Sequence, residues 1–115
     1  MPAASRRWAT PAFGAVVLLS LVVLFAPRAP SDQGIPDLDK VVHAGLFALL
    51  AATTWWRFAG HRAGLVLVIA YGGVSELVQW LALPHRSGDP RDVAADAAGA
   101  LLGWLLAKRT SPRPR

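Results

Sequence analysis

Four apolar stretches alternate with short polar segments along the chain, at residues of about 8–26, 40–58, 63–83 and 90–107. A helix that crosses a bilayer needs roughly 17 to 25 residues, which is about the length of each stretch. The fourth reaches that length only if residues 90–92 form its first turn, and it is rich in Ala and Gly, as in helices that pack closely against neighbours. The pattern predicts an all-α membrane protein, folded as a compact bundle of four transmembrane helices.

The segments between these stretches are short, and no internal repeat is visible, so we expect a single membrane domain over residues 1–115. Residues 108–115 are basic and proline-rich, which predicts a disordered tail. The first stretch follows Arg6 and Arg7, as the apolar core of a cleaved signal peptide would. It is longer than such a core and no small-x-small cleavage site follows it, so we expect an uncleaved helix.

Charge is sparse and uneven along the chain. Hydrophobic residues make up 54% and charged residues 17%, the net charge is +5, and the absence of cysteine excludes disulfides and thiolate metal sites. The basic residues lie at segment ends rather than in a patch with stacking aromatics, so nucleic acid is not expected as a partner.

The charge asymmetry predicts an orientation. With four spans, one side of the membrane receives basic residues without any acid: Arg6, Arg7, Arg57, Arg62, Lys108, Arg109, Arg113 and Arg115. The other side receives acids as well as bases: Asp32, Asp37, Asp39, Asp89 and Asp92 with Arg28, Lys40, Arg86 and Arg91. The positive-inside rule then places both termini in the cytoplasm.

Ionisable residues also lie inside the predicted spans. In this orientation Glu76 lies roughly 10 Å below the outer surface, His43 about one helical turn below it and Asp96 about two turns below it. A charge within a span costs at least about 2.5 kcal/mol, so groups at a similar depth are expected to face one another or a water-filled cavity. We therefore predict a polar site that opens toward the outer leaflet.

Structural roles are the alternative for these polar residues. Asp37 and Asp89 are expected to cap helices, whereas Asp39 and Asp92 fit either a cap or an i,i+4 pairing with His43 and Asp96. The residues within helices would, in that alternative, form a satisfied polar network that holds the bundle together.

The predicted site has nine candidate binding residues: Asp39, Lys40, His43, Tyr71, Glu76, Gln79, Arg86, Asp92 and Asp96. His43 and Glu76 are the candidates for acid–base catalysis. Close helix packing is the expected role of Gly72, Gly99 and Gly103. A metal on His43, Glu76 and an aspartate finds no support in any local ligand spacing, so neither a metal nor a cofactor is expected.

The order of these residues resembles that of the VanZ-like family of small bacterial membrane proteins, over about residues 10–107. The motifs are DKVVHAGLF at 39–47, then Tyr71, Glu76 and Gln79, and then Arg86, Asp92, Asp96, Gly99 and Gly103. Family members usually carry Asn at the position of Asp96, so this chain has an additional acid there. The family is named for a protein associated with teicoplanin resistance.

The resemblance implies a multi-pass protein of the bacterial plasma membrane that acts at the cell envelope. Its partners would be membrane lipids and a lipoglycopeptide or a lipid-linked cell-wall intermediate. Three hypotheses remain: recognition of an amphiphile or lipid head group, with Arg86 and Arg91 meeting an anionic group; an enzyme on lipid-linked substrates with His43 or Glu76 as acid or base; and a structural subunit.

Overall fold

The computed structural model describes residues 7–25, 38–82 and 90–110, except for the side chain of Asp39. These residues form four helices and no strand: α1 (Ala9–Phe25), α2 (Leu38–Arg57), α3 (Arg62–Ala82) and α4 (Pro90–Thr110). The prediction of an all-α fold is thereby confirmed.

The observed helix ends differ from the predicted ones by a few residues. The largest difference is at the end of α4, which continues through Thr110 into the segment expected to be a disordered tail. Lys108 and Arg109 lie in its last turn, where the helix dipole favours cations, and the Thr110 hydroxyl donates to the Leu106 carbonyl at 2.8 Å. The rest of that tail, residues 111–115, lies outside the described residues.

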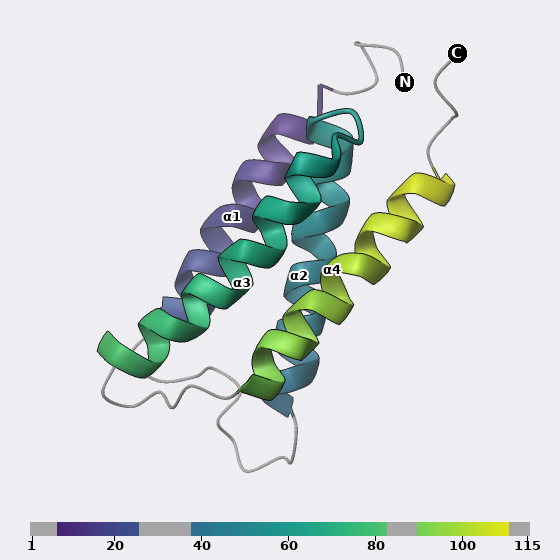
Figure 1. Cartoon of the computed structure of the whole chain (residues 1–115). Helices are drawn as coiled ribbons and strands as arrows, with labels where there is room; N and C mark the ends of the chain where they lie inside the picture. The colour runs from purple at the N-terminus through teal and green to yellow at the C-terminus, as the bar shows by residue number, and fades with distance from the viewer. Residues whose placement is uncertain (1–6, 26–37, 83–89, 111–115) are drawn as a thin grey trace.

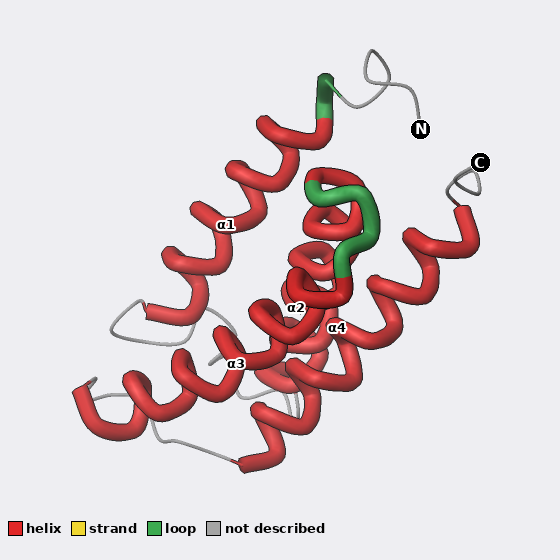
Figure 2. Tube along the Cα trace, turned by 45° about the horizontal axis from the view of Figure 1, so that its top comes forward, coloured by secondary structure: helices red, strands yellow, loops and turns green. Residues whose placement is uncertain are grey.

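Successive helices run in opposite directions (Figure 1). The start of α1, the α2–α3 turn and the end of α4 therefore lie at one end of the bundle, here called the turn end. The other end, where α1 and α3 finish and α2 and α4 begin, is here called the far end. The helix α2 contacts each of the other three helices, and its contact with α4 is the most extensive (Figures 1 and 2).

Glycines allow α4 to lie directly against α2. A Cβ atom built on Gly99 would lie 2.7 Å from the Ala44 Cα, and one on Gly103 would lie 2.6 Å from the Ala48 Cα. Such separations are too short for any side chain, so both positions need glycine for this approach. Just beside them Ala100 and Trp104 are buried in the hydrophobic core.

The turn between α2 and α3 is fixed by its backbone. Ala59 and Gly60 both have positive φ, at 54° and 75°, and the Gly60 N–H donates to the Trp55 carbonyl at 3.0 Å. A left-handed residue followed by such a 6→1 bond is a common way for a helix to end. It sends α3 back along α2 within a few residues.

Membrane-spanning character is uneven among the described helices. The helix α3 is long and apolar enough to cross a bilayer, and α1 is apolar but has only 17 residues. By length and composition, α2 and α4 do not qualify. The crossing of a membrane by all four helices therefore stays a prediction.

Candidate functional site

Four buried ionisable side chains from three helices lie together near the far end of the bundle. They are His43 of α2, Glu76 of α3, and Asp92 and Asp96 of α4, and none is more than 6% exposed. We call these four residues the polar cluster. Because they are distributed over three helices, only the packed bundle brings them into contact.

His43 and Asp96 form the closest pair of the cluster. The His43 Nδ1 atom lies 2.7 Å from the Asp96 Oδ1 atom, and both side chains are almost fully buried. This hydrogen bond fixes the plane of the imidazole ring and leaves its Nε2 atom for other partners. The Asp96 side chain fits against Gly72 of α3, where an added Cβ would lie 3.0 Å from the Asp96 Cβ.

The other two carboxylates face the histidine. One ligand atom from each of His43, Glu76 and Asp92 can be chosen so that all three lie within 4.8 Å of one another. No other group of three His, Asp or Glu residues in the described part of the chain is close enough to share one metal ion. At the edge of the cluster, the Lys40 Nζ lies 3.5 Å from the Asp92 Oδ1.

Three of the four residues of the cluster, His43, Glu76 and Asp96, lie at a similar depth in the bundle. His43 is five residues from the start of α2, and Asp96 is six residues from the start of α4. Glu76 is six residues from the end of α3. At 1.5 Å per residue, all three lie about 8 to 9 Å along their helices from the far end.

Two candidate residues, Tyr71 and Gln79, make their hydrogen bonds with α1 instead. The Tyr71 hydroxyl lies 2.9 Å from the Ser20 hydroxyl, and the Gln79 amide nitrogen donates to the Leu24 carbonyl at 2.6 Å. Helical geometry explains this: Tyr71 is rotated by about 140° and Gln79 by about 60° from Glu76 around the α3 axis. These bonds link α3 to α1, and a role of Tyr71 and Gln79 in binding stays a prediction.

The remaining candidate residues are near the starts of α2 and α4 in the sequence. Arg86 and the side chain of Asp39 lie outside the described residues, and Arg91 is exposed at the start of α4. Sequence reasoning did not single out Ser20, which is fully buried and also donates to the Val17 carbonyl at 2.7 Å. The sequence does show Ser20 as the one hydroxyl residue in the apolar run of residues 15–26, which could have indicated a polar contact there.

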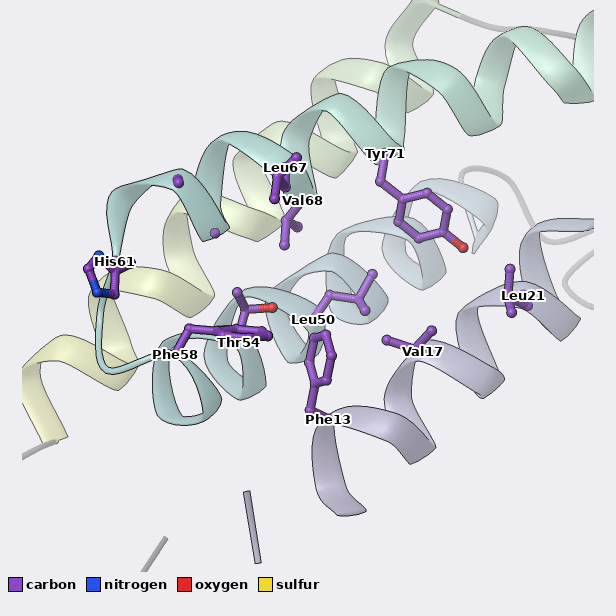
Figure 3. A pocket seen from close by; sticks show the side chains of 12 residues that line it. Phe13, Val17, Leu21, Leu50, Thr54, Phe58, His61, Leu67, Val68 and Tyr71 are labelled. Atoms are coloured by element: carbon purple, nitrogen blue, oxygen red, sulfur yellow. The ribbon is translucent and has the colours of Figure 1, made fainter. Parts of the chain in front are cut away.

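A separate cavity of about 500 Å³ lies between α1, α2 and α3 (Figure 3). Its walls are almost entirely apolar and include Phe13, Leu50, Phe58 and Val68. It extends from the turn end to Tyr71, whereas the polar cluster lies between α2, α3 and α4. The cavity and the cluster are therefore distinct features.

Comparisons with known proteins agree with the motif resemblance. The profile of the VanZ/LLP1 family matches residues 5–111. An uncharacterized protein of Schizosaccharomyces pombe (strain 972 / ATCC 24843), C11E3.10, is 32% identical over 109 residues, which cover 90% of this chain and 64% of the yeast protein. This chain thus spans slightly less than two thirds of that relative. No solved structure matches.

Proposed function

We propose, from the fact that this chain belongs to the VanZ/LLP1 family, that it is a multi-pass protein of the bacterial plasma membrane whose polar cluster binds the head group of an envelope amphiphile. The observation that carries this proposal is the burial of His43, Glu76, Asp92 and Asp96 inside a bundle with an apolar exterior. Ionisable residues within membrane helices are costly and usually mark functional sites.

The distribution of side chains supports insertion of all four helices. Large hydrophobic side chains are exposed on every helix, for example Leu18, Val22, Val41, Leu49, Leu67, Leu81, Leu102 and Leu106. Soluble proteins rarely expose contiguous apolar surfaces while burying carboxylates. A hydrocarbon surrounding removes this conflict, because the exposed side chains then face lipid.

The low mean hydropathy of α2 and α4 is compatible with this arrangement. Several of their polar side chains are buried inside the bundle. They are His43, Thr53 and Thr54 in α2 and Asp92 and Asp96 in α4. A composition test averages over all faces of a helix and so penalises residues that never meet lipid. The outward faces of both helices carry leucine or valine.

The arrangement of charges supports cytoplasmic termini. Arg57, Arg62, Lys108 and Arg109 lie at the turn end, where no acid is found among the described residues. Lys40 and Asp92 lie toward the far end. By the positive-inside rule the turn end faces the cytoplasm, and the polar cluster then lies in the outer leaflet.

The chemistry of the cluster favours a head group with hydroxyl or amine donors. Ionised carboxylates only accept hydrogen bonds, and three of them lie in the cluster. A relative in yeast, which lacks a bacterial cell wall, favours a lipid head group over a glycopeptide as the general ligand. Teicoplanin-type resistance is the more specific form of this proposal.

Lipid retention by the Glu76→Gln variant tests the proposal. Glutamine keeps the size of the side chain but removes its charge, so we expect at least tenfold less co-purified amphiphile by native mass spectrometry, with normal expression and folding. The matched control is Ser75→Ala, since Ser75 is also buried but donates only to the Gly72 carbonyl of its own helix, at 2.9 Å. Unchanged amphiphile in a folded Glu76→Gln protein would refute the role of this carboxylate.

An enzyme acting on lipid-linked substrates is the second candidate. It is favoured by the His43–Asp96 pair, in which a carboxylate orients an imidazole as in many acid–base sites. In that case Glu76→Gln or His43→Gln would abolish turnover while the amphiphile stays bound. A purely structural cluster predicts instead that both variants disappear from the membrane.

A further inference from the structure

We infer that the polar cluster is a divalent-cation site, with His43 Nε2, Glu76 and Asp92 as ligands and Asp96 as the residue that positions His43. The inference rests on the proposed function in that the cation occupies the proposed head-group site. It goes beyond that function because it names an inorganic partner of the chain.

The distances suit a single ion. One ligand atom from each residue, with either ring nitrogen for His43, lies within 4.8 Å of the other two, whereas ligands about 2.1 Å from one metal in a tetrahedral site are about 3.4 Å apart. The ligand atoms would therefore have to approach one another by up to about 1.4 Å, which small side-chain rotations can supply. All three side chains are buried, which distinguishes them from exposed acids that gather at a surface.

The orientation of His43 is the second observation that points to a metal. Its Nδ1 atom is hydrogen-bonded to Asp96 Oδ1 at 2.7 Å, so its Nε2 atom is the one available for coordination. A histidine ligand commonly makes such a bond to a carboxylate through its other ring nitrogen, which fixes the tautomer and strengthens the ligand. Asp96 is itself only 1% exposed and is not one of the three residues whose ligand atoms lie within 4.8 Å of one another.

The formal charges also favour a divalent cation. Glu76, Asp92 and Asp96 bring three negative charges into a buried site, and Lys40 contributes one positive charge beside Asp92. Carboxylates gathered in apolar surroundings favour a bound cation.

The ligand types narrow the choice of ion. Imidazole together with carboxylates suits Zn²⁺ or Mn²⁺ better than Mg²⁺ or Ca²⁺, which prefer oxygen ligands alone. Three protein ligands leave a coordination position open, as in catalytic rather than structural zinc sites. An oxygen atom of the proposed head group would take that position.

Metal titration of the detergent-purified, tag-free full chain tests the inference. After chelator treatment, we expect about one Zn²⁺ per chain by calorimetry, and a rise in melting temperature on addition of ZnCl₂. Glu76→Gln and Asp92→Asn should each weaken Zn²⁺ binding at least tenfold. The matched control is His61→Gln, because His61 is an exposed histidine at the turn end and its loss should leave the affinity unchanged.

Asp96→Asn tests the positioning role separately. We expect roughly 10- to 100-fold weaker Zn²⁺ binding. The visible spectrum of the Co²⁺-substituted protein should change, whereas the melting temperature of the metal-free protein should not. An unchanged affinity and Co²⁺ spectrum in this variant would remove Asp96 from the site.

Three results would overturn the cation site: no Zn²⁺ bound by the wild-type chain, wild-type affinity in Glu76→Gln and Asp92→Asn, or loss of binding in His61→Gln. The wild-type titration remains decisive even if a variant fails to fold. Amphiphile retention without cation binding would refute this inference alone, whereas cation binding without amphiphile would refute only the proposed function.

Discussion

Gly72 determines how deeply Asp96 enters the bundle. A Cβ at position 72 would lie 3.0 Å from the Asp96 Cβ, 3.1 Å from the Asp96 Oδ2 and 3.2 Å from a ring carbon of Phe47. Each separation is tighter than ordinary van der Waals contact, so the Asp96 side chain has little room to retreat. The hydrogen bond from His43 to Asp96 therefore depends on the absence of a side chain on α3.

Alanine at positions 72 and 73 should have opposite effects. Gly72→Ala crowds Asp96 and Phe47, so we expect a loss of about 1 kcal/mol or more in the free energy of unfolding. Gly73→Ala meets nothing within 4 Å and gains helix propensity, so it should be neutral or stabilising. Thermal unfolding in detergent measures both. Equal effects would mean that Gly72 is not packed as described.

Gln79 joins α3 to α1 near the far end of the bundle. Its amide donates to the carbonyl of Leu24, one of the last residues of α1, and helix ends leave such carbonyls without intrahelical donors. Gln79→Leu removes this donor, and we expect a loss of about 1 to 3 kcal/mol in unfolding free energy. Gln79→Glu is the companion variant, since it keeps the length of the side chain but removes the donor. Stability equal to wild type in both variants would contradict this role.

The distance of His43, Glu76 and Asp96 from the ends of their helices could be predicted from the sequence. The direction in which a polar side chain points around its helix axis could be predicted less well. His43, Glu76 and Asp96 are separated by dozens of residues, yet counting from the helix ends places them at one level. Tyr71 lies five residues before Glu76, which is a rotation of about 140° around the helix, so its hydrogen bond to Ser20 of α1 follows from helix geometry. The close approach of Asp92 to His43 depends on helix packing and has no local signature.

At the scale of elements, the contact between α2 and α4 determines where the cluster forms. His43 and Ala44 are neighbours on α2, and Asp96 and Gly99 lie on one side of α4 within a helical turn. The backbone contact of Gly99 with Ala44 therefore sets the distance at which Asp96 meets His43. The same turn of α2 and the same turn of α4 therefore provide both the close backbone contact and the hydrogen bond between His43 and Asp96.

Alanine at Gly99 should separate these helices. The added Cβ would overlap the backbone of Ala44, which cannot move away as a side chain can. We expect a loss of about 1 to 3 kcal/mol in unfolding free energy and weaker binding at the polar cluster. The control is Gly45→Ala on α2, which meets nothing within 4 Å. If Gly99→Ala unfolds like Gly45→Ala, the close approach is not a source of stability.

The existence and order of the helices could be predicted from apolar runs and their punctuation by Pro and Gly. Their exact ends could not, since the end of α4 depends on local bonds such as that of Thr110. The reversal at Ala59 falls in one of the short segments between apolar stretches, but the left-handed backbone of an alanine is not visible in the sequence.

On the scale of the whole molecule, a hydrophobic core is accompanied by buried polar side chains and by a largely apolar exposed surface. Buried side chains include Glu76, Gln79 and Asp96, while leucines cover much of the exposed surface. Hydropathy averaged along a helix does not show this arrangement, because it counts inward and outward faces equally. The three-dimensional distribution is therefore a stronger argument for insertion than the composition of α2 or α4 alone.

Single cysteines should label from opposite sides of the membrane, since the chain has none of its own. His61→Cys places a thiol in the exposed α2–α3 turn, and Ser87→Cys places one in the segment that joins α3 to α4. In intact cells we expect an impermeant maleimide to modify position 87 and not position 61, because the proposed topology places the basic turn end in the cytoplasm. Labelling of both after permeabilisation shows that each thiol is reactive. The reverse pattern would place the polar cluster in the inner leaflet, and labelling of both in intact cells would contradict a four-span topology.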